Sequence, residues 1–304
     1  MRQSIRGYTD GVIELAGDTS SLASIATELS AIKQVVDASE DLRRVLADAG
    51  VTASARRAVV TELFQSRVSD RSLELVNFAV DADRAGEFLS NLTWLVARVE
   101  AAARGARPVS EPVLGHHAAE ERLDGYATAV LGQLRGDAEL TRVADELFRF
   151  MRVVDGSTEL TVALTDRDVP AERRRSLVED LLRTKTEPIT LHLAAYATQV
   201  GRPRDYQALL GFLVDRVAAE SNRRLAEVRA AVDLDESQRQ QLADALSRVV
   251  GRGVDIRVTI DPSVLAGFVA TIGDTVVDGS ARHRLEILKE RLLTPEATVN
   301  TGDS

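Results

Sequence analysis

The chain of 304 residues contains no cysteine, only three lysines (Lys33, Lys185 and Lys289) and no long apolar run. Without cysteine there are no disulfides, thiolate zinc sites, iron–sulfur clusters or cysteine nucleophiles, and the composition fits a reducing compartment. The remaining 35 basic residues are arginine, which we interpret as the mark of a GC-rich genome.

Membrane-spanning and signal segments are also missing from the sequence. The longest uncharged stretch that could be helical is 188–201, whose 14 residues include several polar ones. A transmembrane helix needs about 20 largely apolar residues. Because residues 1–11 are polar and no apolar segment follows, no signal peptide is predicted. The chain is therefore expected not to span a membrane by itself.

The charge balance disfavours general binding to nucleic acid or to anionic membranes, because the net charge is −9 and the pI is near 5.1. Any membrane association should therefore be indirect. Hydrophobic residues at 44% and charged residues at 28% are typical of a soluble protein with a buried core.

No sequence motif points to catalysis, and we predict no catalytic, cofactor-binding or metal-binding residue. The phosphate-binding, zinc-protease and nucleophile-elbow motifs are all missing. His116 and His117 are predicted to lie in a solvated linker, because sequence neighbours rarely chelate one ion. Asp81/Asp83 and Asp233/Asp235 are spaced at i, i+2, so the members of each pair do not face each other on a helix. Asp235 is better explained as a helix cap.

A repeat with an offset of 118 residues organises the first two thirds of the chain. Gly7-Tyr8 recurs as Gly125-Tyr126, and 30 of the 98 aligned pairs from 7/125 to 104/222 are identical without a gap. Chance would give roughly one in ten. The sequence thus predicts a duplicated domain, with repeat 1 at 1–104, a linker at 105–124 and repeat 2 at 125–222.

Each repeat has the periodicity of helices. Five apolar residues of repeat 1 recur at intervals of three and four, and so do their five counterparts in repeat 2. These stripes are Leu22, Ile25, Leu29, Ile32, Val36 and Leu140, Val143, Leu147, Phe150, Val154. Ser39 and Ser157 are predicted N-caps, Pro170 suits a first helical turn, and Trp94 and Phe212 are predicted core aromatics. Six helices per repeat, in repeat 1 near 2–15, 19–37, 40–48, 53–66, 70–82 and 85–103, predict two tandem six-helix bundles.

The pattern changes near Arg223, where a small α/β domain is predicted at 223–293. Residues 225–232 and 254–260 alternate as strands do, and a helix is expected between them at 236–250. A further strand at 266–272 leads through Gly273-Asp274 to 275–277. Asp278-Gly279 is predicted to supply a tight hairpin turn, and Ser280 to cap a terminal helix at 281–293. The polar tail 294–304 is predicted to be disordered.

The segment 263–285 resembles the signature of the F-type ATP synthase delta subunit, the oligomycin-sensitivity-conferring protein family. The matching residues are Gly267, Gly273, Asp274, Asp278, Gly279, Ser280, Arg284 and Leu285. On physical grounds these residues are structural, since the glycines permit close backbone approach. The mainly α chain, with an extra helical repeat before the usual N-terminal domain, resembles delta subunits of high-GC Gram-positive bacteria.

The resemblance implies a noncatalytic, peripheral-stalk subunit of the proton-translocating ATP synthase, without a cofactor. Its implied partners are the alpha-subunit N-terminus, the C-terminal end of the b subunit and other subunits of the catalytic head, but no nucleic acid. The implied location is the cytoplasmic face of the cell membrane, as a peripheral protein within the complex. The alternative is a helical protein–protein adaptor unrelated to ATP synthase.

The resemblance further implies that the alpha segment lies between the first and fifth helices of a repeat. In repeat 2 the implied contacts are Tyr126, Val130, Leu134, His192 and Tyr196; in repeat 1 they are Tyr8, Val12, Leu15 and Phe78. The two sets differ, since Glu74 becomes His192 and Phe78 becomes Tyr196. Two hypotheses follow: either the two repeats bind two different ligands, or one repeat binds a ligand and the other is a spacer. We favour repeat 2 as the alpha-binding copy.

Overall fold

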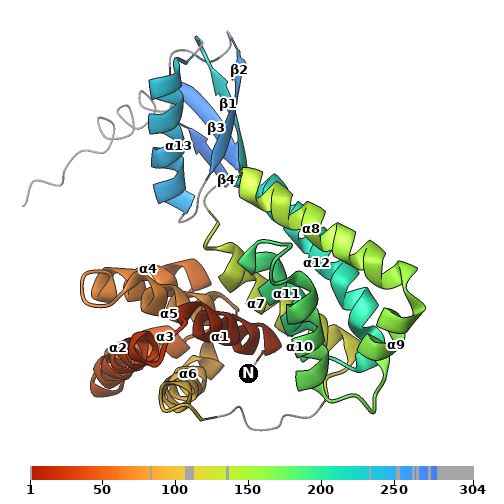
Figure 1. Ribbon diagram of the computed structural model, residues 1–304. Coiled ribbons are helices and arrows are strands. Elements are labelled where there is room, and N and C mark those ends of the chain that lie inside the picture. The colour runs from red at the N-terminus through yellow and green to blue at the C-terminus, as the bar shows by residue number, and fades with distance from the viewer. Residues whose placement is uncertain are drawn as a thin grey trace, which may run out of the picture. The chain divides into compact units, whose positions relative to one another are not determined.

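The computed structural model describes residues 2–278, apart from 83, 107–112, 135–136, 233, 251–253, 262–263, 265–266 and 273–274. These residues are mainly helical and end in a small sheet (Figure 1). They form two compact units, one of residues 1–133 with 142–217 and the other of 134–141 with 218–304. Both repeats therefore contribute to the first unit.

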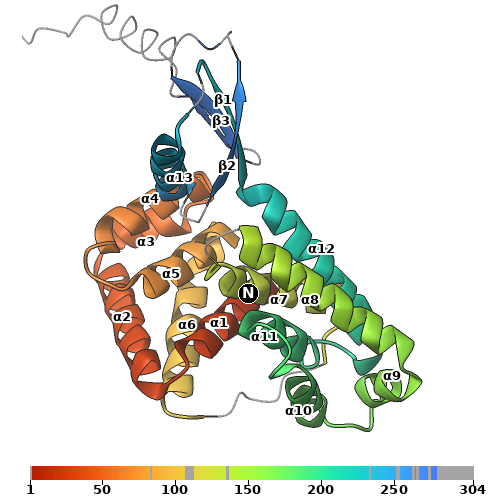
Figure 2. The ribbon, with the colours of Figure 1, turned by 45° about the horizontal axis from the view of Figure 1, so that its top comes forward.

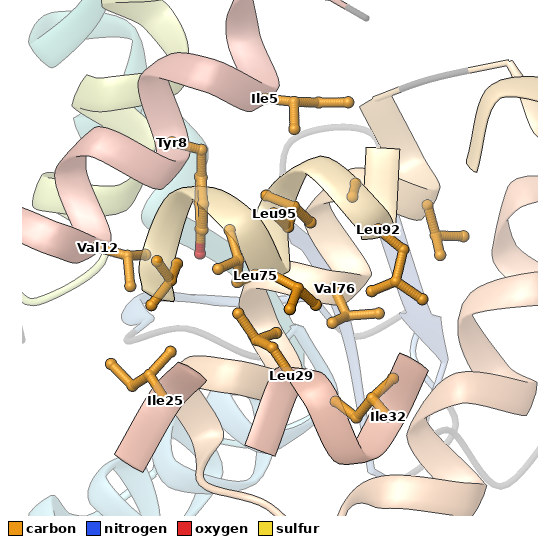
Figure 3. Close-up of a cluster of buried hydrophobic side chains, with 14 of the residues drawn as sticks. Ile5, Tyr8, Val12, Ile25, Leu29, Ile32, Leu75, Val76, Leu92 and Leu95 are labelled. Atoms are coloured by element: carbon orange, nitrogen blue, oxygen red, sulfur yellow. The ribbon is translucent and has the colours of Figure 1, made fainter. Parts of the chain in front are cut away.

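Repeat 1 folds as a series of helices whose bounds lie within a few residues of the predicted ones. They are α1 (Gln3–Ala16), α2 (Thr19–Ala38), α3 (Glu40–Ala47), α4 (Ala53–Phe64), α5 (Asp70–Ala82), the 3-10 turn η1 (Ala85–Glu87) and α6 (Phe88–Ala103). Figure 3 shows Leu29, Leu75 and Leu95 from three of these helices meeting in one core. The predicted stripe of α2 is buried throughout, which confirms the periodicity.

Repeat 2 follows the same order. Its elements are α7 (His116–Leu131), α8 (Asp137–Gly156), α9 (Thr158–Thr165), α10 (Ala171–Leu182), α11 (Pro188–Ala197), η2 (Pro203–Asp205) and α12 (Tyr206–Arg224). The predicted stripe of α8 is fully buried, with Phe150 the most exposed member at 4%. The predicted aromatic pair is less buried than expected, because Trp94 and Phe212 keep intermediate exposure.

Short-range hydrogen bonds define the helix ends as the sequence predicts. Ser39 accepts from the Leu42 amide and Ser157 from the Leu160 amide, both at 3.2 Å. Pro170 is the N-cap residue of α10 rather than a residue of its first turn. Asp235 accepts from the Gln238 amide at 2.8 Å, which confirms it as a cap.

A long-range cap occurs in both repeats. Glu28 of α2 accepts hydrogen bonds from the amide and the hydroxyl of Ser69, and from the hydroxyl of Ser72, at the start of α5. In repeat 2, Glu146 of α8 accepts from the Glu187 amide and the Thr190 hydroxyl at the start of α11. A carboxylate at the positive end of a helix stabilises it. The fifth helix of each repeat is thus fixed to the second.

The linker prediction is wrong at its C-terminal end, because α7 already begins at His116. Gly115 is the N-cap residue, and the alanines and glutamates that follow are good helix formers. His116 therefore lies in the first helical turn, where its Nε2 atom is 3.2 Å from Oε1 of Glu120.

The second unit contains a four-stranded sheet in the order β2-β1-β3-β4. The strands are β1 (Leu225–Ala230), β2 (Asp255–Ile260), β3 (Phe268–Ile272) and β4 (Thr275–Asp278). β1 pairs in parallel with β2 across the crossover helix α13 (Glu236–Val250), and β3 is antiparallel to both β1 and β4. Ala226 and Val228 of β1 pack with Leu242 and Leu246 of α13, which covers one face of the sheet (Figure 1).

The hairpin turn was predicted at the wrong place. β3 and β4 are paired neighbours separated by residues 273–274, and Asp278 is the last residue of β4, opposite Val269. The register of the two strands fixes the position of the turn, because Ile272 pairs with Thr275 and only residues 273–274 lie between them. Gly267 has a φ of 88°, a conformation that favours glycine. The predicted terminal helix and tail, with Gly279, Ser280, Arg284 and Leu285, lie outside the described residues, as do Gly273 and Asp274.

The two repeats are joined through their first helices. α1 packs along α7 more extensively than any other two described elements pack together, and both ribbon views show them side by side (Figures 1 and 2). A β-carbon on Gly7 would lie 1.8 Å from the Arg122 carbonyl oxygen, and one on Gly125 would lie 1.9 Å from the Ser4 carbonyl oxygen. Since Ser4 and Arg122 are themselves 118 residues apart, the contact is pseudo-symmetric. Only glycine allows this backbone approach.

Adding a methyl group at the crossing should separate the repeats. We expect Gly7→Ala and Gly125→Ala each to lower the free energy of unfolding by about 1–3 kcal/mol, as measured by denaturant titration. Gly211→Ala, at a helical position with no atom within 4 Å, is the control and should be neutral or stabilising by up to about 1 kcal/mol. Equal stabilities for all three variants would contradict the close crossing.

Candidate partner-binding site

The described residues contain no group of three or more histidine, aspartate or glutamate side chains able to hold a metal ion. No helix among them is long and apolar enough to cross a bilayer. Most of the predicted partner-binding side chains lie on helices of the two repeats.

The structure brings two of the five predicted residues of repeat 2 together. The rings of Tyr126 on α7 and Tyr196 on α11 are stacked with centroids 3.7 Å apart and planes 6° apart. Val130 and Leu134 are also buried, whereas His192 is half-buried, with its Nδ1 atom enclosed and without a hydrogen-bond partner in the described structure. Repeat 1 has the same arrangement, because Tyr8 stacks on Phe78 with centroids 4.1 Å apart.

The packing of α1 accounts for part of this burial. Gly11 of α1 lies against the Tyr126 carbonyl and the Ala129 side chain. The predicted helix pair of repeat 2 is thus in contact with repeat 1.

A polar cluster around Asp10 holds the repeats together beside this crossing. The Asp10 carboxylate accepts from Arg98 at 3.0 Å, from Arg122 at 2.8 Å and from the Tyr196 hydroxyl at 2.7 Å. Its side chain is 13% exposed, as is that of Arg122. Glu14, one turn further along α1, accepts from Arg175 of α10 at 2.7 Å. Charged hydrogen bonds of this kind are stronger than neutral ones.

The cluster occurs on one side of the pseudo-symmetric interface only. The counterparts of Asp10 and Glu14 are Thr128 and Gly132, and the counterpart of Arg122 is Ser4. Thr128 receives a hydrogen bond from Arg216, which also binds Asp124 at 2.7 Å. The two sides of the interface therefore present different chemistry to a ligand.

A groove of about 1820 Å³ opens on the side that carries the cluster. Its walls come from α1, α6, α7 and α10 and from the loops that precede α10 and follow α11. Tyr196 is the one member of the predicted set of five that lines it; Asp10, Arg122, Trp94 and Arg175, which the sequence did not predict as site residues, line it as well.

The sequence carries a signal for this interface in the small residues of α1 and α7. Small residues recur four apart at Gly7 and Gly11, and again at Gly125 and Ala129. Such spacing places small side chains on one helix face, where another helix can approach closely.

The described residues define the class as a mainly helical protein, with two pseudo-symmetric repeats followed by a small sheet. Comparison with protein families matches residues 5–106 and 124–292 to the model described as "ATP synthase delta (OSCP) subunit". The chain belongs to this family.

Relatives resemble the chain over nearly all of its length. It is 34% identical over 282 residues to "ATP synthase subunit delta" of Nocardia farcinica, covering 91% of this chain and 93% of the relative. The proteins of the same name from Kineococcus radiotolerans and Streptomyces coelicolor are both 31% identical, over 92% and 96% of this chain and 91% and 94% of the relatives. These matches confirm the resemblance found in the sequence.

Loss of the Asp10 carboxylate should destabilise the repeat interface. Asp10→Asn leaves Arg98 and Arg122 without their shared anion, and we expect the free energy of unfolding to fall by about 2 kcal/mol. Asp124→Asn is the matched control, because Asp124 also binds an arginine but its side chain is 44% exposed. Its effect should stay below about 1 kcal/mol. A larger loss in the control than in Asp10→Asn would contradict this interpretation.

All four tyrosines of the chain should resist ionisation while it is folded. Burial raises the pKa of Tyr8, Tyr126, Tyr196 and Tyr206, and the nearby carboxylates of Asp10 and Glu14 contribute at Tyr196 and Tyr126 respectively. Free tyrosine has a pKa of about 10. The stability that the four buried tyrosines contribute in their neutral form is therefore complete below that pH and is lost as the pH rises above it. Tyrosinate absorbance should therefore appear together with loss of helical circular dichroism. Tyrosine ionisation in a fully helical chain would show that the prediction is wrong.

Proposed function

We propose that this chain is the delta subunit of an F-type ATP synthase and acts as part of its peripheral stalk. Family membership over more than nine tenths of the chain is the observation that carries this proposal. The subunit makes and breaks no bond. Its task is to hold the catalytic head against the torque of the central shaft, at the cytoplasmic face of the membrane.

The helical repeats are the proposed binding site for the alpha-subunit N-terminal segment. The stacking of Tyr126 on Tyr196 supports this assignment, because it holds α7 and α11, the first and fifth helices of repeat 2, against each other. Val130, Leu134 and His192 belong to the same proposed contact. Tyr196 is the member of this set that lines the groove.

A stator must also resist deformation, and the interface between the repeats is suited to this. Helix backbones in direct contact at Gly7 and Gly125 leave little room for side chains to rearrange. The cluster around Asp10 adds charged hydrogen bonds beside the crossing.

The C-terminal unit is the proposed attachment for the end of the b subunit. Its sheet and α13 form a core distinct from that of the helical repeats. The separate core allows one part of the chain to hold the head and another to hold the stalk.

A complex assembled without this chain tests the function. Membranes that lack it should still hydrolyse ATP at the head, but hydrolysis should no longer drive proton transport. The purified wild-type chain should restore transport and co-purify with alpha and b. Full coupling in its absence would contradict a stator role.

Truncation after residue 222 tests the division of labour. The shortened chain should stay helical and unfold cooperatively, because the core of repeat 1 and the core of the sheet share no residue. It should lose the b subunit in a pull-down assay. Retention of b would place the stalk contact on the repeats.

A further inference from the structure

The crossing of α1 and α7 has the geometry of a two-fold dimer interface, although it lies within one chain. A β-carbon on Gly11 would lie 2.8 Å from the β-carbon of Ala129, and these two residues are counterparts in the two repeats. A residue that meets its own counterpart lies at the symmetry axis. Each surface of such an interface is complementary to a second copy of itself. The shape of the helix faces alone therefore does not determine which repeats pair.

Three pairings of this surface have to be compared. Repeat 1 pairs with repeat 2 in the structure, whereas pairing of two like repeats would join two copies of the chain. The contacts of a like pair follow when each residue is replaced by its counterpart in the other repeat. The close backbone approach is available to all three pairings, because the first helices carry glycine at equivalent positions, Gly7 and Gly125.

Two copies of repeat 2 do not fit together at the axis. Ala129 would meet a second Ala129 there, and the 2.8 Å between its β-carbon and a β-carbon in place of Gly11 is well inside the optimal separation of two carbon atoms. Arg122, whose side chain is 13% exposed, would face Thr128 and lose the carboxylate of Asp10. Both shape and charge therefore oppose this pairing.

Two copies of repeat 1 fit at the axis, where two glycines would meet, and are opposed by charge. Asp10 would face Ser4 and Phe78, the counterparts of the two donors that repeat 2 supplies. Of the three donors described above it would keep only Arg98, which belongs to its own repeat. A carboxylate that is 13% exposed would thus lose two hydrogen bonds, and symmetry would repeat this loss in the second copy.

We propose that Asp10 and Arg122, with Gly11 and Ala129 at the axis, restrict this surface to the pairing of repeat 1 with repeat 2. The surface then fits the unlike repeat of its own chain and, by exchange of repeats, the unlike repeat of a second copy. The short connection 104–115 gives the intramolecular partner a high effective concentration. The wild-type chain is therefore expected to be a monomer, and exchange to occur when the intramolecular pair is mismatched.

Reversing the charges in separate chains tests this pairing rule. Asp10→Arg and Arg122→Asp are prepared as two full-length proteins and refolded from denaturant, singly and as an equimolar mixture. Each variant alone has a mismatched pair, whether it pairs within the chain or with its own copy. In the mixture, an exchanged dimer contains one natural pair and one charge-reversed pair, so that both of its interfaces are matched.

Size-exclusion chromatography with light scattering measures the result. We expect the mixture to contain more than about tenfold as much dimer as either variant alone, because like charges at an interface are strongly unfavourable. The double variant Asp10→Arg/Arg122→Asp in one chain should be a monomer with the circular dichroism of the wild type. It also shows whether both substitutions are compatible with the fold.

Arg57→Asp and Asp81→Arg are the matched control. This ion pair of 3.0 Å joins α4 to α5 within repeat 1, so exchange of repeats cannot restore it, and its mixture should contain no more dimer than the single variants. A monomeric mixture of the Asp10 and Arg122 variants, equal dimerisation of either variant alone, or as much dimer in the control mixture overturns the pairing rule. The proposed function is unaffected by either result, since no other subunit takes part.

Discussion

The direct contact between the backbones of α1 and α7 is the constraint on which the helical part of the molecule depends. At Gly7 and at Gly125 the neighbouring carbonyl oxygen occupies the place of a β-carbon. Helices this close cannot be separated by a larger residue without loss of the surrounding packing. Most of the two copies that the sequence presents in tandem therefore lies in one compact unit.

The pairing of the repeats combines an internal symmetry with a chemical asymmetry. Both repeats use the same helix face in the crossing. The contact of Gly7 with Arg122 and the contact of Gly125 with Ser4 are therefore related by an approximate two-fold axis. On one side of it, however, Asp10 gathers three donors, whereas on the other side the corresponding position is Thr128. A partner that recognises charge can distinguish the two sides even though the cores are alike.

The interface also bears on the two hypotheses for repeat 1, a second ligand site or a spacer. In the structure, α1 contacts the predicted helix pair of repeat 2 and contributes Asp10, Ile13 and Glu14 to the groove. A repeat that forms a wall of its neighbour's groove has a third role, as part of a composite surface. Among the residues proposed to contact alpha, Tyr126 and Val130 are buried, and Tyr196 is the one that lines the groove.

The sequence alone determined the elements. Periodicities of 3.6 and 2 depend on local geometry, so the stripes at Leu22–Val36 and Leu140–Val154, the caps at Ser39 and Ser157, and the alternation of β1 could all be predicted. The signature around Gly267 also pointed to the family that the comparisons then established. These features arise from residues close together along the chain.

Only the tertiary structure decided how the elements meet. The predicted linker extended past the start of α7 at His116. The hairpin between β3 and β4 was misplaced because Gly273 and Gly279 are both local turn signals, and strand pairing decides between them. The contact of Gly7 with Arg122 and the Asp10 cluster join residues more than a hundred positions apart. No periodicity encodes such a contact, because it depends on the shape of two folded surfaces and on the close approach that missing side chains allow.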